Sequence, residues 1–234
     1  QSDVVLSAGT NTITFKGTVN GTHALTIGND TDTTNVTFEK SVGSVNKLAS
    51  LDVKGTITAN EAISTTGNIA VGGVANVTEV TSSGGAISVT GDATASGTIS
   101  ARGNISFGGN ADVAGVTSTS GVISFTGDAT ASGAISADGD ITFGKNAIIN
   151  EVTSTYGAIS VGGTTSANGN ITSAKSQTFN GAFTLNKTVT ILAKNNTVLF
   201  KDTVNGTYDL AIGNNANATN KKKKKSVGST DVIN

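Results

Sequence analysis

The chain contains no cysteine, proline, methionine or tryptophan, and it has one histidine (His23) and one arginine (Arg102). Without cysteine it has no disulfide framework, no thiolate nucleophile and no cysteine-ligated metal site. A single histidine also excludes a site built from several histidines. Apolar residues form 36% of the 234 residues and charged residues 13%. Both shares lie below the usual ~45–50% and ~25% of globular domains, so the chain has little material for a conventional core.

Long apolar runs and an excess of positive charge are also missing. No run approaches the ~18 residues of a transmembrane helix, and no secretion signal is recognisable. The formal net charge of −1 argues against a surface that binds nucleic acid along the whole chain. We therefore expect no membrane insertion and no nucleic-acid partner. The missing initiator methionine suggests a processed chain or a segment of a longer one.

Glycine is abundant, with 30 residues, and its spacing reveals an internal repeat. The sequence TGDATASG occurs at 90–97 and again at 126–133, within the contiguous copies 81–116 and 117–152. Each copy has two halves of equal length, marked by apolar–polar–apolar triplets such as Ile87–Val89 and Ile105–Phe107. From Leu51 to Thr188 the chain divides further into 23 hexads, of which 17 have glycine at the fifth position. Such a constant phase over so much of the chain indicates a repeat architecture.

The hexads predict short strands joined by tight corners. Positions one and three are mostly apolar or small and position two is mostly serine or threonine, which is the period of a strand with one buried face. We expect the glycine at position five to turn the chain with a positive φ. Three successive strand–corner units predict one triangular coil, and the coils are expected to stack as parallel strands ~4.8 Å apart. The predicted fold is therefore all-β, a single-stranded parallel β-helix (β-solenoid).

A strict hexad register predicts one inward column of alternating chemistry. In that register Thr81, Thr117 and Thr153 alternate with Ile99 and Ile135. This alternation makes the double-coil repeat stronger than the single-coil repeat. We expect the threonine hydroxyls to bond neighbouring backbone, since a buried hydroxyl without a partner costs ~1–3 kcal/mol.

The two ends of the chain differ from the hexads and resemble each other. Residues 1–50 have wider apolar spacings, which predict less regular, longer coils, whereas 51–188 form the regular hexad block. The sequence FKGTVNGTHALTIGN at 15–29 returns as FKDTVNGTYDLAIGN at 200–214, an offset of 185. We therefore predict that residues 189–234 form coils that repeat residues 4–49. The chain is expected to be one long repeat unit plus an overlap, cut from a larger array or able to continue one.

The motif TFKGTVNGTHALTIGN at 14–29 resembles the repeats of secreted bacterial β-helix adhesins of the filamentous-haemagglutinin and autotransporter types. This resemblance covers roughly residues 1–53 and 186–220. It implies a parallel β-helix in a secreted or cell-surface protein. The central hexads, with glycine–asparagine or glycine–aspartate corners, are similar to bactofilins, whose triangular helices are right-handed and polymerise. The six-residue period is also similar to left-handed hexapeptide helices, which commonly place glycine differently. We expect a right-handed solenoid.

No residue of the chain is singled out as catalytic, cofactor-binding or metal-binding. The nearest candidate for a metal site is the corner column Asp92, Asn110, Asp128 and Asn146, which could at most hold Ca²⁺ weakly. We interpret it as a ladder of turn residues. His23 is replaced by Tyr208 in the second flank copy, so a surface position is favoured over a catalytic one.

Two surface features invite a functional interpretation and do not support one. A regular threonine column could bind ice, but the best candidate is interrupted and is interpreted as solvated β-surface: Thr58, Asn76, Thr94, Asp112, Thr130, Ile148 and Ser166. The lysine run 221–225 aligns with the strand 36–40 at the offset of 185. Five lysines cannot fill a strand with one buried face without burying charge, and the run has no firm interpretation.

The sequence thus predicts a structural, non-enzymatic repeat rod of an extracellular adhesin, filament or surface appendage. The expected partners are other copies, end to end or side by side, or a continuing array. Alternatives are a module that binds host or cell-surface glycans and a polymer-forming scaffold similar to bactofilins. Tyr156 and Tyr208 are the only tyrosines, which leaves little aromatic surface for stacking on sugars. An enzyme that cleaves polysaccharides is disfavoured because Arg102 is the only arginine and no group of acids and bases is apparent.

Overall fold

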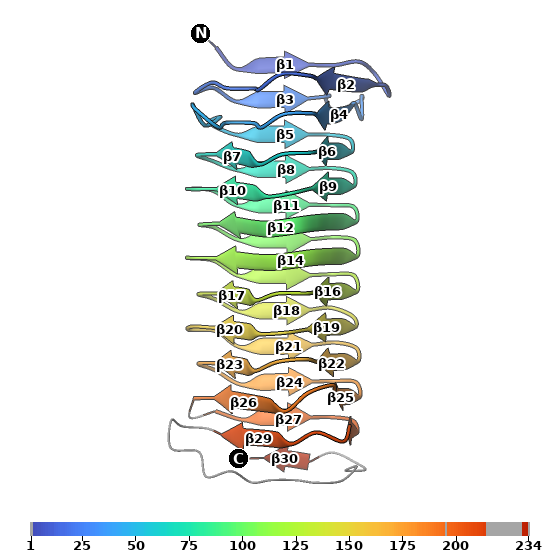
Figure 1. Cartoon of the computed structure of the whole chain (residues 1–234), viewed down its shortest axis with the longest axis vertical. Helices are drawn as coiled ribbons and strands as arrows, with labels where there is room; N and C mark the ends of the chain where they lie inside the picture. Colours follow the sequence, from blue (N-terminus) through green and yellow to red (C-terminus); the bar gives the residue numbers. More distant parts are fainter. Residues whose placement is uncertain (1, 195, 214–230, 234) are drawn as a thin grey trace. The chain divides into compact units, whose positions relative to one another are not determined.

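The computed structural model describes residues 2–194, 196–213 and 231–233, and none of these residues lies in a helix (Figure 1). The described part of the chain therefore contains no helix able to span a membrane. The chain divides into two units, Gln1–Thr119 and Ser120–Asn234. In both, short strands of successive coils pair in parallel, which confirms the predicted all-β parallel β-solenoid. The lysine run 221–225 lies outside the described residues.

In the N-terminal unit each coil has three sides. The first side carries β1 (Val4–Leu6), β3 (Leu25–Ile27), β5 (Leu51–Val53), β8 (Ile69–Val71), β11 (Ile87–Val89) and β13 (Ile105–Phe107). The second side carries β2 (Thr12–Phe15), β4 (Asn35–Phe38), β6 (Ile57–Ala59) and β9 (Ala75–Val77). The third side carries β7 (Ile63–Thr65) and β10 (Val80–Ser82). Two long strands, β12 (Ala93–Ala101) and β14 (Ala111–Ser118), run through the corner and lie on both the second and third sides.

The C-terminal unit repeats these three sides. The first side carries β15 (Ile123–Phe125), β18 (Ile141–Phe143), β21 (Ile159–Val161), β24 (Gln177–Phe179), β27 (Val198–Phe200) and β30 (Asp231–Ile233), which pairs antiparallel with β27. The second side carries β16 (Ala129–Ala131), β19 (Ala147–Ile149), β22 (Thr165–Ala167), β25 (Phe183–Leu185) and β28 (Val204–Asn205). The third side carries β17 (Ile135–Ala137), β20 (Val152–Ser154), β23 (Ile171–Ser173), β26 (Val189–Ala193) and β29 (Leu210–Gly213).

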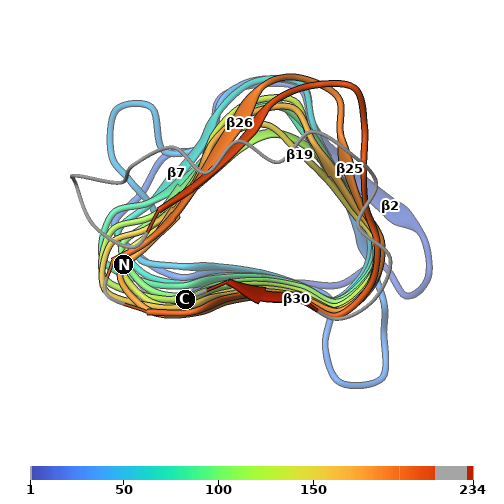
Figure 2. The same cartoon turned by 90° about the horizontal axis from the view of Figure 1, so that it is seen from below.

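Coil length follows the sequence pattern. In the hexad region the first-side residues pair at a constant interval, as in Leu51 with Ile69 and Ile69 with Ile87. Coils near the chain ends are longer, because Leu25 pairs with Leu51, and Gln177 pairs with Val198. Figure 2 shows blue loops of the N-terminal coils outside the triangular outline. The extra residues are therefore accommodated in loops, and the strands keep their places.

The coils are right-handed in each unit, as expected. Within each unit, the later coils lie nearer the reader in Figure 2, because the view is from below. The first side lies at the bottom, where β30 is labelled; the second side lies on the right, at β2 and β25; the third lies at the upper left, at β7 and β26. The chain passes these sides in that order, counterclockwise while approaching the reader, which is a right-handed path.

Each side buries two side chains and turns the one between them outward. The three-residue strands repeat this pattern, as in β6, where Ile57 and Ala59 are buried and Thr58 is half-buried. Aromatic rings lie on the same inward positions: Phe125 and Phe143 stack with their centroids 5.0 Å apart and their planes 1° apart. The core is narrow because every side contributes only two inward residues per coil.

The third side departs from the strict hexad register, so the predicted threonine column is wrong. Ile63 pairs with Val80, one position earlier than the strict register requires, and Val80 pairs with Ile99. Valine therefore takes the inward place expected for threonine, and Thr81 faces outward beside Ser100. The same shift pairs Ile135 with Val152 and Val152 with Ile171 in the C-terminal unit. The double-coil repeat thus reflects a shift by one position in every second coil.

A buried serine makes the hydrogen bonds expected of the threonine. Ser82 Oγ donates to the Gly67 carbonyl oxygen at 2.7 Å and accepts from the Gly85 N–H at 3.0 Å. Ser154 donates to the Gly139 carbonyl at 2.8 Å and accepts from the Gly157 N–H at 3.0 Å. Ser118 donates to the Gly103 carbonyl at 2.8 Å. These serines lie in the shifted coils, and Thr65 and Ser173 carry hydroxyls at the same corner in two unshifted coils.

The reason for the hexad glycines also differs from the prediction. Gly73, Gly91 and Gly109 do not have the expected positive φ. They stack directly on the glycine of the preceding coil: a Cβ on Gly73 would lie 2.7 Å from the carbonyl carbon of Gly55, and one on Gly109 would lie 2.6 Å from that of Gly91. Glycine suits this corner because two backbones approach closely. Among the described residues, a positive φ is found at places such as Gly28 and Gly43 in the longer coils.

Candidate functional site

The Asp/Asn column at the corner after the first side has a structural role. Asp92 Oδ1 accepts the N–H of Asn110 in the next coil at 2.7 Å, and Asp128 Oδ1 accepts the N–H of Asn146 at 3.0 Å. Asn146 Oδ1 in turn accepts both the N–H and the hydroxyl of Thr164, at 2.9 Å each. One oxygen of each side chain therefore bonds to the next coil. This arrangement fits the interpretation as a ladder of turn residues.

Groups of three or more acidic or histidine side chains that could hold a metal ion are absent from the described residues. Asp92 and Asp128 are two coils apart in the sequence repeat, with an asparagine between them. The arrangement therefore offers an amide–carboxylate alternation in place of the several converging carboxylates that a Ca²⁺ site needs.

The column considered for ice binding does align on the second side. Thr58 pairs with Asn76 and Asn76 with Thr94 in the N-terminal unit, and Thr130 pairs with Ile148 in the C-terminal unit. Ile148 is 46% exposed. The structure thus places these outward side chains as the hexads predict, but their chemistry changes from one coil to the next.

The outward column of the third side is more uniform, and the strict hexad register concealed it. In the N-terminal unit it runs through Ser64, Thr81, Ser100 and Thr117. In the C-terminal unit Ser136, Thr153 and Thr172 align in the same way. These hydroxyl-bearing side chains give the third side an uncharged polar surface. Sequence reasoning missed this column because the shift by one position interchanges the inward and outward places.

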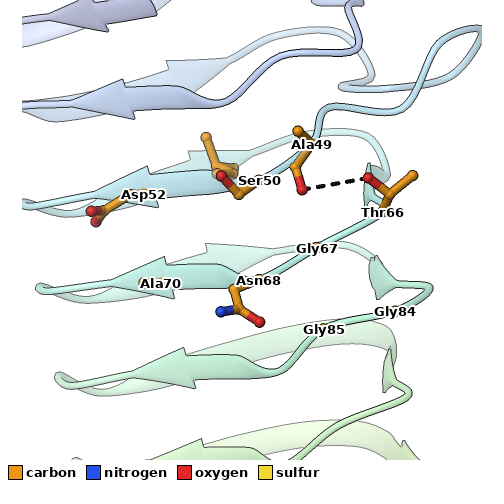
Figure 3. Close-up of a pocket in the computed structure, with 10 residues that line it drawn as sticks. Ala49, Ser50, Asp52, Thr66, Gly67, Asn68, Ala70, Gly84 and Gly85 are labelled. Carbon is orange, nitrogen blue, oxygen red and sulfur yellow. Dashed lines mark hydrogen bonds between the residues drawn. The ribbon is translucent and has the colours of Figure 1, made fainter. Parts of the chain in front are cut away.

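A shallow hollow of about 520 Å³ lies on the N-terminal unit where the first side begins (Figure 3). It is lined by Ala49, Ser50, Leu51, Asp52, Thr66, Gly67, Asn68, Ala70, Gly84 and Gly85. Figure 3 shows the Thr66 hydroxyl donating to the Ala49 carbonyl oxygen, at 3.4 Å. Asp52 is the only titratable residue of this lining, so the hollow lacks the acid–base pair of a hydrolytic site.

Two polar side chains of the hollow, Asp52 and Asn68, already have partners. Asp52 Oδ2 accepts from Lys54 Nζ at 2.8 Å, and Asn68 Oδ1 accepts the Ala86 N–H at 2.9 Å. The hydrogen bond and the charge of Asp52 raise the pKa of Lys54 above its ordinary value, with a smaller contribution from Asp30 and against a small opposing effect of burial. Both side chains of the pair are about one-third exposed, so this is a surface ion pair.

The histidine and the tyrosines are not part of the lining of the hollow. His23 Nδ1 is 3.8 Å from Asp3 Oδ1 on the surface of the first coil, and that carboxylate also accepts the Ala24 N–H. Tyr156 and Tyr208 are 69% and 49% exposed. They belong to the C-terminal unit, whereas the hollow belongs to the N-terminal unit, and its lining contains no aromatic ring.

No family model matches the chain, no curated protein matches it, and no solved structure matches it.

Proposed function

We propose that the chain is a structural, non-enzymatic solenoid module of an extracellular adhesin, filament or surface appendage. The observation that carries this proposal is that the groups that looked like site residues bond one coil to the next. Asp92 and Asp128 bond the following coil, and Ser82 and Ser154 close a corner against neighbouring backbone. Stability of such a fold is roughly a sum over coils and their interfaces, which suits a protein whose task is to extend.

The surface supports the same proposal. Its outward columns are mainly serine and threonine. The ion pairs found among the described residues are few and peripheral: Lys40 with Glu61, and Lys54 with Asp52. Such a surface is polar without strong charge. The resemblance of residues 1–53 and 186–220 to repeats of secreted adhesins is the basis for proposing an extracellular location.

Glycan binding is the second candidate, and the exposed rings of Tyr156 and Tyr208 favour it. Aromatic faces are common platforms for sugars because they are apolar and rigid. A polymer-forming scaffold similar to bactofilins shares the solenoid and differs in being intracellular. Self-association is expected of both the extracellular module and the intracellular scaffold.

Atomic force microscopy of the full chain, over a range of protein concentrations, tests the structural proposal. Elongated particles one coil wide, which join into longer ones as concentration rises, are expected. Compact particles at every concentration would contradict it. A glycan array is the companion experiment: strong and specific binding that Tyr156→Ala abolishes would favour the glycan-binding function instead.

A further inference from the structure

The first two strands of the N-terminal unit have one edge that no described residue covers. In the part of the chain that the structure describes, β1 pairs only with β3, and β2 pairs only with β4 (Figure 1). Their apolar side chains are correspondingly accessible: Val4 is 45% exposed, and Leu6, Ile13 and Phe15 are only half-buried. An uncovered strand edge with an apolar face is a template for pairing with another strand.

The second copy of this sequence shows what covers such an edge. The counterparts of these four residues, at the offset of 185, are Val189, Ile191, Val198 and Phe200, and they are 0–2% exposed. They are buried because β26 and β27 pair with the preceding strands β23 and β24, as in Ile171 with Ile191. The two copies differ in the coil stacked above them rather than in their apolar side chains.

The coil itself is the same in both copies. Val4 pairs with Leu25 and Leu6 with Ile27 in the N-terminal unit. Their counterparts pair identically, Val189 with Leu210 and Ile191 with Ile212. A segment with the same sequence pattern and the same internal register can therefore occupy either place.

The copies nevertheless lie on different sides of the triangle. β1 lies on the first side, whereas its counterpart in β26 lies on the third; β2 lies on the second side, whereas its counterpart in β27 lies on the first. Val19 forms a bridge on the third side with Val42, whereas its counterpart Val204 is in β28 on the second. Each strand of the second copy therefore lies one side of the triangle earlier than its counterpart in the first copy.

We propose that β1 and β2 are a docking edge for a second copy of this chain. They bind the partner's β23 and β24, in the place that the partner's own residues 189–204 occupy. This proposal rests on the proposed structural function and specifies its self-association. In this head-to-tail joint, the first coil of one copy replaces the matching later coil of its partner. The first side of one copy then stacks on the third side of the other.

The register of the joint follows from the pairs within this chain. Leu6 takes the place of Ile191 opposite Ile171, and Ile13 takes the place of Val198 opposite Gln177. Phe15 takes the place of Phe200, which stacks on Phe179 with centroids 5.1 Å apart. Gln177 Nε2 donates to the backbone carbonyl of Leu192 at 2.8 Å. Any residue supplies that acceptor, so Ser7 replaces Leu192 without loss of the bond.

Intermolecular disulfides test this register in the full chain, which has no cysteine of its own. Thr14→Cys chains are mixed with Thr178→Cys chains under mild oxidation, and the matched control pairs Thr14→Cys with Thr184→Cys. Thr178 and Thr184 are both half-buried outward residues, on β24 and β25. The proposed joint places position 14 beside position 178, at the ~4.8 Å spacing of paired strands, which a disulfide spans. A joint without the one-side shift places position 14 beside position 184.

The proposal predicts that the 14–178 product forms at least about tenfold faster than the 14–184 product. Adding Ile191→Asp to the Thr178→Cys chain should raise the yield by about tenfold or more, since a buried charge loosens the competing coil. Thr190→Asp, at an exposed position of the same coil, should leave it unchanged. Phe15→Asp in the Thr14→Cys chain should abolish the product.

Equal rates for the two pairs, a faster 14–184 product, or no product at any concentration would overturn the docking register. Unchanged or lower yield with Ile191→Asp would overturn the exchange of coils. Filaments seen by microscopy together with any of these results would remove this inference while leaving the structural function intact. Compact particles without filaments would contradict both.

Discussion

Gly91 lies directly against Gly73 of the preceding coil. A Cβ on Gly91 would be 2.7 Å from the Gly73 carbonyl carbon, and the Gly91 N–H donates to the Gly73 carbonyl oxygen at 3.1 Å. The same contact joins Gly73 to Gly55 and Gly109 to Gly91. A Cβ at Gly91 would force the neighbouring backbone to shift, so glycine allows the close approach of the two coils at this corner.

Gly91→Ala should therefore destabilise the chain by about 1–3 kcal/mol, the usual cost of forcing atoms into a packed region. Gly17→Ala is the matched control, because nothing lies within 4 Å of a Cβ at Gly17. It should be neutral or slightly stabilising. Urea unfolding followed by circular dichroism measures both. Equal midpoints for the two variants would show that a Cβ is accommodated at this corner without cost.

The serine corner gives a second prediction. Ser154→Ala removes the donor to the half-buried Gly139 carbonyl and the acceptor of the buried Gly157 N–H, and leaves both groups beside a methyl group. The expected loss is about 1–3 kcal/mol in the free energy of unfolding. Ser160→Ala, an outward residue of the neighbouring first side, should cost less than about 0.5 kcal/mol. A Ser154→Ala chain as stable as the unchanged one would refute the role given to this hydroxyl.

The stacked phenylalanines of the C-terminal unit give a third. Phe143 is 1% exposed and stacks on Phe125, so Phe143→Ala should cost about 3–5 kcal/mol through lost burial and a cavity. Thr142→Ala changes the outward neighbour and should have little effect. Thermal unfolding of both variants checks this, and a loss under about 1 kcal/mol for Phe143→Ala would mean that the coil collapses around the site.

The Asp/Asn column gives a fourth. Asp92→Asn keeps an oxygen for the Asn110 N–H, whereas Asp92→Ala removes it. The asparagine variant should match the unchanged chain, and the alanine variant should lose about 0.5–1.5 kcal/mol. Millimolar Ca²⁺ should leave the melting temperature of the unchanged chain where it is. A rise with Ca²⁺ that Asp92→Asn abolishes would identify a metal site instead.

Much of this fold is predictable from the sequence, because hexads bring equivalent residues to equivalent places. The first and second sides follow the strict register: Ile87 pairs with Ile105, and Ala75 pairs with Ala93. The third side does not, because Val80 and Thr81 are both compatible with a buried strand position. Period alone cannot decide between them, and only the packing of Val80 against Ile63 and Ile99 settles the register.

The corners are predictable only in part, for a similar reason. A glycine at a fixed phase indicates either a positive φ or a close approach of two backbones, and both are compatible with Gly-Asp corners. Stacking of Gly91 on Gly73 is a contact between coils, so it becomes visible only in three dimensions. The one-side shift between Phe15 and Phe200 is hidden for the same reason, since their sequences are nearly identical and their neighbours differ.

The stacking of each coil on the next is the premise of every proposal made for this chain, and one distance tests it directly. Thr26→Cys and Ser106→Cys place spin labels on the outward column of the first side, four coil steps apart through Asp52, Ala70 and Ser88. Pulsed electron–electron double resonance should give a single narrow distance peak. Four steps of ~4.8 Å predict a backbone separation of ~19 Å, to which the length of the labels adds. A broad distribution that extends to much longer distances would contradict the stacked solenoid. An unfolded segment of about 80 residues is expanded, with a radius of gyration of about 28 Å, and would give such a distribution.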